Sequence, residues 1–242
     1  MSNTTSTTEI KVLITGFGPF LDITTNPSWE IAQKLPASLL SANGTTIKLI
    51  VPDAPIPAAY HKLLTQTTSL IKQHNPHIII HMGLAVDRNY FAVEQSALKE
   101  GYHDIPDIER KVITRAENKK IFGKAPPALT TSFDLDSIAP AWQAACAHLT
   151  LPSKGEGPKA KGSGKGKQEK RKVDVRLSDD VGTYVCGLIY FSSLVNMQKR
   201  KEVRDAVFLH VPRLEGDGEV AVGAEVAKEL VVALVDAWEA RM

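Results

Sequence analysis

Apolar positions along the chain fall into two kinds of segment, short continuous runs of strand length and longer segments with helical spacing. Runs bounded by glycine or proline favour buried strands, whereas apolar residues that recur every three or four positions favour amphipathic helices. Asn26 followed by Pro27 is a typical N-cap and first helical residue. The pattern predicts strands at residues 11–17, 46–57, 77–85 and 206–214, helices at 28–35, 58–74, 136–149 and 218–240, and a turn entering a helix at 174–197.

Two stretches lack such a pattern. Residues 86–131 mix short alternating runs with polar turns, so we expect hairpins and long loops there. Residues 153–172 are too polar and glycine-rich to pack, so we expect a disordered insertion, and also a disordered terminus at residues 1–10. Strands that alternate with helices predict one α/β domain over residues 11–242, with a mainly parallel sheet flanked by helices on both faces.

The composition is that of an ordinary globular protein, with 242 residues, 43% hydrophobic and 23% charged. The two cysteines, Cys146 and Cys186, are too few for a disulfide framework and lack metal-site spacing, so we expect no metal and a reducing compartment. The first ten residues lack the apolar core of a secretory signal, and no apolar stretch is long enough to cross a bilayer. We therefore expect a cytoplasmic location and no membrane partner.

The formal net charge of +2 is dominated by one segment. Residues 153–172 carry eight basic and two acidic residues, a net of +6, and subtracting this from +2 leaves −4 for the rest of the chain. The basic balance therefore belongs to a predicted loop, and we do not expect a nucleic-acid-binding face. A homo-oligomer is compatible with the sequence, which leaves the oligomeric state open.

The first predicted strand runs into GFGPF, a turn that resembles the phosphate-binding loops of nucleotide-binding folds. A dinucleotide fingerprint needs a third glycine where this chain has Leu21, Pro19 removes a backbone donor, and a P-loop would need Gly-Lys-Ser/Thr. These features argue against a nucleotide cofactor. Phe17 and Phe20 are then either core residues or the lining of a slot for a small, flat, apolar group, because open α/β sheets bind ligands at the carboxyl ends of strands.

Cys186 is the stronger candidate for a reactive thiol. It follows a glycine turn near a predicted helix N-terminus, where unpaired amides and the helix dipole lower the pKa of a thiol and stabilise an oxyanion. Cys146 lies in the middle of a predicted helix among alanines and fits an inert core residue better. The alternative for Cys186 is a buried structural cysteine.

The partners of such a thiol are less distinctive. His210 ends an apolar strand and is either a satisfied core histidine or a base at the sheet edge, and His77, His81 and His148 also flank apolar runs. Glu94 interrupts an alternating apolar run. It is therefore either a solvent-facing residue on an edge strand or a carboxylate that orients a histidine.

Four segments in order resemble the pyroglutamyl peptidase I family of cysteine peptidases: GFGPF with NPSW, GLAVDRNYFAVEQSA, DVGTYVC and FLHVP. The resemblance implies a three-layer α/β/α sandwich with a mainly parallel central sheet. It also implies an exopeptidase that removes pyroglutamate from the amino terminus of peptides without a metal or a cofactor. By motif, Cys186 would be the nucleophile, His210 the base, and Glu94 the carboxylate that orients His210.

The resemblance also implies a pocket for the pyroglutamyl ring. This ring is an uncharged lactam, so an apolar slot would accept it, whereas a charged free amine would be rejected by the cost of its desolvation. The positions that match the family's pocket are Phe17, Phe20, Asn26, Tyr184 and Val185.

The chain departs from the family's pattern at four positions. Gly187 stands where asparagine usually follows the cysteine, Gln95 and Lys99 replace a basic residue and an asparagine, and Leu21 replaces a glycine. These departures motivate an alternative function, a binding protein on the same scaffold that recognises capped peptide amino termini without hydrolysis. A third hypothesis makes residues 153–172 an anchor for RNA or acidic partners.

Overall fold

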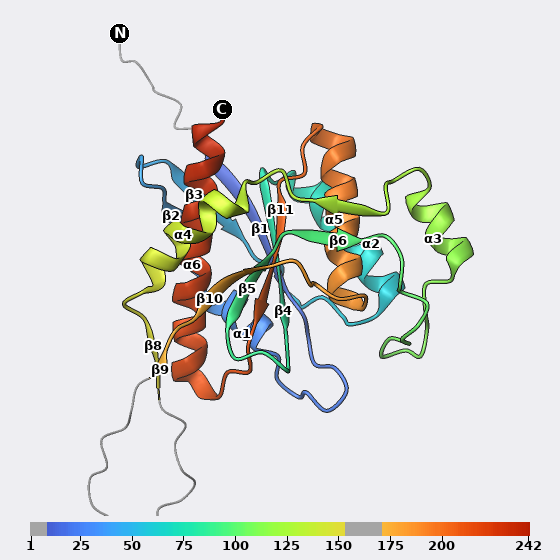
Figure 1. Cartoon of the computed structure of the whole chain (residues 1–242), viewed down its shortest axis with the longest axis horizontal. Helices are drawn as coiled ribbons and strands as arrows, with labels where there is room; N and C mark the ends of the chain where they lie inside the picture. The colour runs from blue at the N-terminus through green and yellow to red at the C-terminus, as the bar shows by residue number, and fades with distance from the viewer. Residues whose placement is uncertain (1–8, 153–170) are drawn as a thin grey trace, which may run out of the picture.

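A seven-stranded sheet lies at the centre of the computed structural model, which describes residues 9–152 and 171–242 (Figure 1). β11, β4, β1 and β3 run parallel, β5 pairs antiparallel with β11, and β2 pairs antiparallel with β3. β10 is parallel to β5. The spatial order is β10 (Val175–Ser178), β5 (Phe91–Glu94), β11 (Ala206–Val211), β4 (Ile78–Leu84), β1 (Ile10–Gly16), β3 (Thr46–Ile50) and β2 (Ser38–Leu40).

Helices cover both faces of this sheet, which confirms the expected three-layer α/β/α sandwich. Figure 1 shows α4 and α6 on one side of the sheet and α2 and α5 on the other. α1 packs against α6, and α2 packs against α5. The first face carries α1 (Pro27–Lys34), α4 (Leu135–Cys146) and α6 (Gly216–Ala240), and the second carries α2 (Tyr60–His74) and α5 (Val185–Lys201).

Strand alternation divides the apolar core into two clusters. All seven residues of β4 are buried, because the strand has a neighbour on each side and helices on both faces. Ile78, Ile80 and Met82 belong to the cluster that also contains residues of α6, whereas Ile79 belongs to the cluster that contains residues of α2 and α5. Because alternate residues of a strand share a face, His81 and Gly83 lie on the α2 and α5 side.

Parts of the middle segment differ from the expectation of hairpins and loops. α3 (Arg115–Phe122) is a helix that begins at a capping box, in which Thr114 and Glu117 bond each other's backbone amides. Phe122 at its end packs edge-on against Phe191 of α5, with ring centroids 5.0 Å apart. The hairpin expectation holds for β6 (Ser96–Leu98) and β7 (Ala128–Thr130), which pair antiparallel on either side of α3 in the sequence.

The remaining expectations concern the two segments predicted to lack order. Residues 1–8 and 153–170 lie outside the described residues. Ile10 already belongs to β1, and the last two residues of the basic tract form β9 (Arg171–Lys172), which pairs with β8 (Thr150–Leu151). No helix in the described ranges is long and apolar enough to span a membrane.

Candidate active site

Three strands bring Gly83, Glu94 and His210 to the face that α5 covers. Phe208 and His210 alternate on β11 and share one face, and Phe208 belongs to the core cluster of α2 and α5. In the parallel register His210 lies opposite Gly83 of β4, and in the antiparallel register Phe208 lies opposite Glu94 of β5. The sheet therefore places a histidine and a carboxylate as neighbours beneath α5.

Cys186 is the second residue of α5 and lies directly over β4. A Cβ atom added at Gly83 would be 3.0 Å from the Sγ atom of Cys186 and 2.7 Å from Cζ of Phe208. Gly83 therefore leaves the space that the thiol occupies, and any larger residue would displace it. The thiol therefore lies over the strand partner of His210, at the end of the sheet that carries the histidine.

The histidine and the carboxylate form a direct hydrogen bond. Nδ1 of His210 is 2.7 Å from Oε1 of Glu94, and both side chains are almost completely buried. An ionised carboxylate can only accept a hydrogen bond, so Nδ1 carries the proton and donates it. This tautomer leaves the lone pair of Nε2 available on the other side of the ring.

Glu94 is buried inside the sheet, so the solvent-facing alternative is wrong. Its side chain is 0% exposed, because it lies on the face that α5 covers and because β10 covers the outer edge of β5. Burial alone would raise the pKa of Glu94, but hydrogen bonds from His210 and Arg88 outweigh burial and hold this pKa at about 2. The carboxylate also accepts the backbone amide of Asp180, at 2.9 Å from Oε2.

The thiol of Cys186 differs from the sequence-based expectation of a lowered pKa. Burial raises the pKa of Cys186 to about 12, and the negative charge of Glu94 adds to this effect while Arg88 opposes it. The N-terminus of α5 does not compensate for the loss of water around the sulfur. The resting thiol is therefore protonated at neutral pH, and it needs a base to become a nucleophile.

Cys146 and His81 are buried in the core of the protein. Cys146 is buried in the core, and burial raises its pKa to about 12, as expected for an inert thiol. His81 bridges the hydroxyls of Thr15 and Ser193, each at 2.7 Å, and burial lowers its pKa to about 3. Within residues 9–152 and 171–242, no group of three or more His, Cys, Asp or Glu side chains is arranged to hold a metal ion.

The GFGPF turn is fastened to the start of α1. Asn26 caps the helix by accepting the amide of Ser28, as the sequence predicts, and its Nδ2 donates to the carbonyl of Gly18 at 3.0 Å. The hydroxyl of Ser28 accepts the amide of Phe17 at 3.0 Å and donates to Asn26. Both ends of the Asn26 amide are thus used inside the protein, and the residue is 3% exposed.

The aromatic residues proposed for the pocket are buried to different extents. Phe17 is 3% exposed and belongs to the core cluster of α2 and α5, whereas Phe20 is half-buried at the margin of that cluster. Tyr184 is also half-buried, and Val185 is buried. Tyr60 packs edge-on against Tyr184, with ring centroids 5.6 Å apart, and so fixes the ring just before Cys186.

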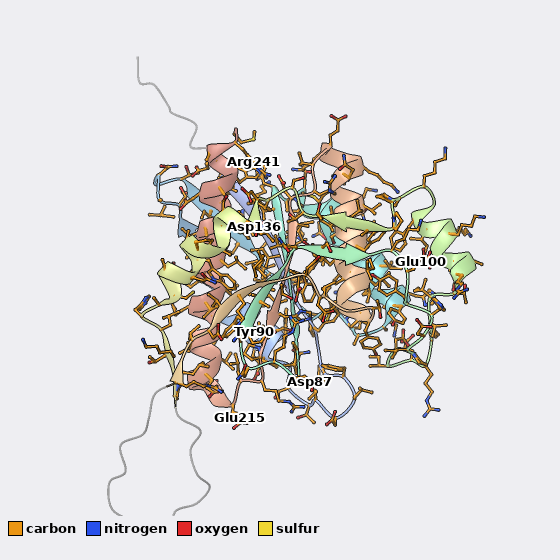
Figure 2. The ribbon with its side chains drawn as sticks, in the orientation of Figure 1. Asp87, Tyr90, Glu100, Asp136, Glu215 and Arg241 are labelled. Carbon is orange, nitrogen blue, oxygen red and sulfur yellow. The ribbon has the colours of Figure 1, made fainter. Side chains whose placement is uncertain are left out.

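Arg88 and Gly83 are site residues that the sequence analysis did not single out. Arg88 lies between β4 and β5, in the segment that Figure 2 marks by Asp87 and Tyr90, and its Nη1 donates to Oε1 of Glu94 at 2.6 Å. A cation six residues before a buried carboxylate was the available signal. Hydrophobic periodicity does not show whether the loop that carries Arg88 folds back onto β5, so the contact with Glu94 could not be predicted.

The four residues that depart from the family's pattern take no part in the hydrogen bond between His210 and Glu94. A Cβ atom at Gly187 would overlap the carbonyl oxygen of Gly182, so the loop before α5 packs directly on the helix. Nζ of Lys99 donates to the carbonyl of Ala125 at 2.9 Å, and the backbone N–H of Gln95 donates to the carbonyl of Ser178 at 2.8 Å. Leu21 is 82% exposed, with a φ angle of 49°.

The sequence was also compared with known proteins. The family model described as pyroglutamyl peptidase matches residues 10–146, a segment that contains Glu94 and ends before Cys186. The pyrrolidone-carboxylate peptidase of Thermosipho melanesiensis is 27% identical over 203 residues, covering 84% of this chain and 83% of that protein. Pyroglutamyl-peptidase 1 of Homo sapiens is 24% identical, covering 84% and 79%.

Solved structures share the fold. Pyrrolidone carboxyl peptidase from Thermococcus litoralis superposes with a TM-score of 0.72 at 20% identity, and the match covers 96% of each chain. Pyroglutamyl peptidase I from Bacillus amyloliquefaciens superposes with a TM-score of 0.68 at 24% identity, and the match covers 95% of each chain. At these identities the superpositions show a common fold.

Proposed function

The chain belongs to the pyroglutamyl peptidase family, and we propose that it is a cysteine exopeptidase that hydrolyses the amino-terminal pyroglutamyl group of peptides, with Cys186, His210 and Glu94 as its catalytic residues. The observation that carries the assignment is the buried hydrogen bond between His210 and Glu94 beneath the thiol-bearing end of α5. A nucleophile, a base and a group that orients the base are the requirements of covalent acyl transfer.

In the proposed mechanism, Nε2 of His210 accepts the proton of the Cys186 thiol as sulfur attacks the pyroglutamyl carbonyl carbon. The raised pKa of the thiol makes this proton transfer part of the attack itself, rather than a step completed before substrate binds. The imidazolium formed is stabilised by the ionised Glu94 through Nδ1. It then protonates the leaving amine, and water activated by the same nitrogen hydrolyses the thioester.

The N-terminus of α5 is the proposed oxyanion site. The first hydrogen bond within the helix is donated by Leu188 to the carbonyl of Tyr184. The amides of Cys186 and Gly187 precede this bond, in the turn where helical amides have no intrahelical acceptor. They are therefore placed to donate to the negative oxygen that develops when Cys186 attacks.

We propose that the pyroglutamyl ring binds between the GFGPF turn and the residue pair before the nucleophile. Phe20 and Tyr184 are half-buried and can contact the ring, whereas Phe17 and Val185 are buried in the core cluster against which both pack. Asn26 holds the turn through its bonds to Gly18 and Ser28. An apolar slot of this kind favours an uncharged lactam over a charged amino terminus, because the amine would lose its hydration.

The test is the hydrolysis of pyroglutamyl-7-amino-4-methylcoumarin by the full-length protein. We expect Cys186→Ala to abolish turnover, and Cys146→Ala to retain it wherever the variant is folded. Cys146 is a matched control because both thiols have a pKa raised by burial, but of the two only Cys186 lies over Gly83, the strand partner of His210. Absence of turnover by folded wild-type protein, or equal loss in the two variants, would reject the proposal.

The same assay tests the alternative hypothesis of a binding protein that recognises capped amino termini without hydrolysing them. Such a protein would gain thermal stability from pyroglutamyl peptides and would release no product. The departures that motivated this alternative do not disturb the hydrogen bond between His210 and Glu94, so the structure gives no reason to prefer it. A cytoplasmic location belongs to the proposal and is tested by fractionation of cells that express the protein at native level.

A further inference from the structure

Arg88 closes a ring of charge-assisted hydrogen bonds around the carboxylate of Glu94. Its Nη1 donates to Oε1 of Glu94 at 2.6 Å, and its Nη2 donates to the carbonyl of Asp180 at 2.7 Å. The amide of Asp180 donates in turn to Oε2 of Glu94 at 2.9 Å. One guanidinium thus holds the carboxylate and the loop that leads into α5 in a single fork, a geometry that lysine cannot reproduce.

Arg88 and His210 share the same oxygen atom of Glu94. Nδ1 of His210 lies 2.7 Å from Oε1, the atom that also accepts from Arg88. Side chains at this point have little access to solvent, since Arg88 is 16% exposed and Glu94 is 0% exposed. Charges at such separations interact strongly when water is excluded, so the arginine offsets the attraction between an imidazolium and the carboxylate.

Resting on the proposed function, we propose that Arg88 is a positioning residue that keeps His210 neutral in the resting enzyme. A buried carboxylate on its own would favour the imidazolium and with it a preformed ion pair with a thiolate, as in cysteine peptidases of low thiol pKa. With Arg88 in place, the carboxylate is already neutralised. The resting site then holds a thiol and a neutral imidazole, and the ion pair forms only during attack.

The other charged and titratable groups around His210 do not replace Arg88 in this role. From α5, Cys186 is neutral at working pH because burial raises its pKa, and Tyr190, whose pKa burial raises well above 10, also stays neutral. The loop before α5 contributes Asp179, which interacts electrostatically with Tyr190, and Asp180, whose carboxylate is 85% exposed; both charges are negative and would favour an imidazolium. Among the described groups facing this site, Arg88 is the cation in contact with Glu94.

Two substitutions separate the charge of Arg88 from its geometry. Arg88→Gln removes the positive charge and keeps an amide that can donate to Glu94, whereas Arg88→Lys keeps the charge and loses the fork to Asp180. We expect Arg88→Gln to move the acid limb of the pH profile of kcat/KM upward by about one unit or more. We expect Arg88→Lys to leave that limb within about 0.3 units of wild type, with kcat/KM about tenfold lower.

Arg176 provides the matched control. Its guanidinium lies over the same tyrosine, 4.0 Å from the centre of the Tyr90 ring, against 5.8 Å for Arg88. It pairs with Asp174 and does not reach Glu94. Arg176→Gln should therefore leave the acid limb and kcat/KM unchanged.

A readout without turnover separates this inference from the proposed function. NMR titration of the His210 imidazole in isotope-labelled protein should show a higher midpoint in Arg88→Gln than in wild type, whether or not either protein cleaves the coumarin substrate. Coincident titration curves in the two folded proteins would overturn the inference, as would an equal shift in Arg88→Lys or Arg176→Gln. Lack of turnover by wild type would reject the proposed function alone.

Discussion

Replacing Gly187 by alanine or asparagine tests how tightly the loop before α5 is packed on the helix. The family's pattern has asparagine at this position, so a simple expectation is that Gly187→Asn improves the enzyme. The structure predicts the opposite. A Cβ atom at residue 187 would overlap the carbonyl oxygen of Gly182 and would lie 3.1 Å from Oη of Tyr102. The obstacle is backbone, so it cannot be relieved by a change of rotamer.

The expected loss of stability follows from two opposing contributions. Alanine is favoured over glycine inside a helix by about 1 kcal/mol, and by less in the first turn. Overpacking of a close-packed site costs about 1–3 kcal/mol, and more when the backbone has to move. We expect a net destabilisation of about 1–2 kcal/mol for Gly187→Ala, which lowers the melting temperature by roughly 2–8 °C for a chain of this size.

Activity should fall by more than stability explains. Movement of Gly182 displaces Asp180 in the same loop, and the amide of Asp180 donates to the charged Glu94. A hydrogen bond to a charged group contributes about 1.5–3 kcal/mol, so its loss should lower kcat about tenfold or more.

Circular dichroism melting and the coumarin assay, applied to the same samples, measure the two effects. Gly218→Ala in α6 is the control, since its added Cβ would approach only Cγ of Pro152, at 3.3 Å. A Gly187→Ala or Gly187→Asn protein as stable and as active as wild type would refute the reasoning.

Three further predictions concern separate parts of the molecule. Leu21→Gly should raise the free energy of unfolding, measured in urea, by about 0.5–1 kcal/mol. The φ angle of 49° at Leu21 costs most residues about 1–2 kcal/mol, and glycine loses part of this gain through its greater freedom in the unfolded chain. A lower urea midpoint would contradict this. His81 has its pKa lowered by burial to about 3, so the unfolded chain binds a proton below about 6.5 that the folded protein does not bind until about 3. Stability should therefore fall by about 2 kcal/mol between pH 7 and pH 5 through this residue, and a folded His81→Gln variant should show a smaller fall in urea unfolding at the two pH values. Phe20→Ala should raise KM for pyroglutamyl substrates in a protein that melts near the wild-type temperature. Phe17→Ala should instead lose about 3–5 kcal/mol of stability, because Phe17 is a core residue. Equal effects on KM without loss of stability would show that both rings line the slot.

The parts of the fold that follow from hydrophobic periodicity could be predicted from the sequence. The strands β1, β4 and β11 are mostly apolar, because parallel strands at the centre of a sheet are buried on both faces. Asn26 could be identified as an N-cap because asparagine is among the preferred N-cap residues and proline is favoured at the first helical position. α3 was missed because its sequence is mostly polar, and the available signal was the capping box formed by Thr114 and Glu117.

The burial of Glu94 could not be predicted, because it depends on a strand that reads as a turn. β10 has two polar residues among four and is followed by acidic residues, so its pattern is typical of a loop. Without β10, β5 would be an edge strand, and the Glu94 carboxylate would lose the loop after β10, whose Asp180 amide binds it. The expectation of a lowered pKa for the Cys186 thiol was wrong for a related reason. The sequence shows that Cys186 lies at the start of a helix, but it does not show how far the surrounding protein excludes water from the sulfur.

The depth of Glu94 in the sheet accounts for the need for Arg88. β5 begins at the edge where β4 and β11 end, and it runs inward, so Ala92 lies opposite His210 and Glu94 lies one pair deeper, opposite Phe208. A carboxylate at that depth reaches Nδ1 from inside the sheet and leaves Nε2 directed away from it. At that depth it is also beyond the reach of water, so its charge has to be compensated by protein groups. Arg88, which lies in the loop before β5, and the amide of Asp180, in the loop after β10, supply that compensation. In the proposed site, the placement that would orient the base therefore also requires a cation beside it, and we expect Glu94 and Arg88 to act as one unit.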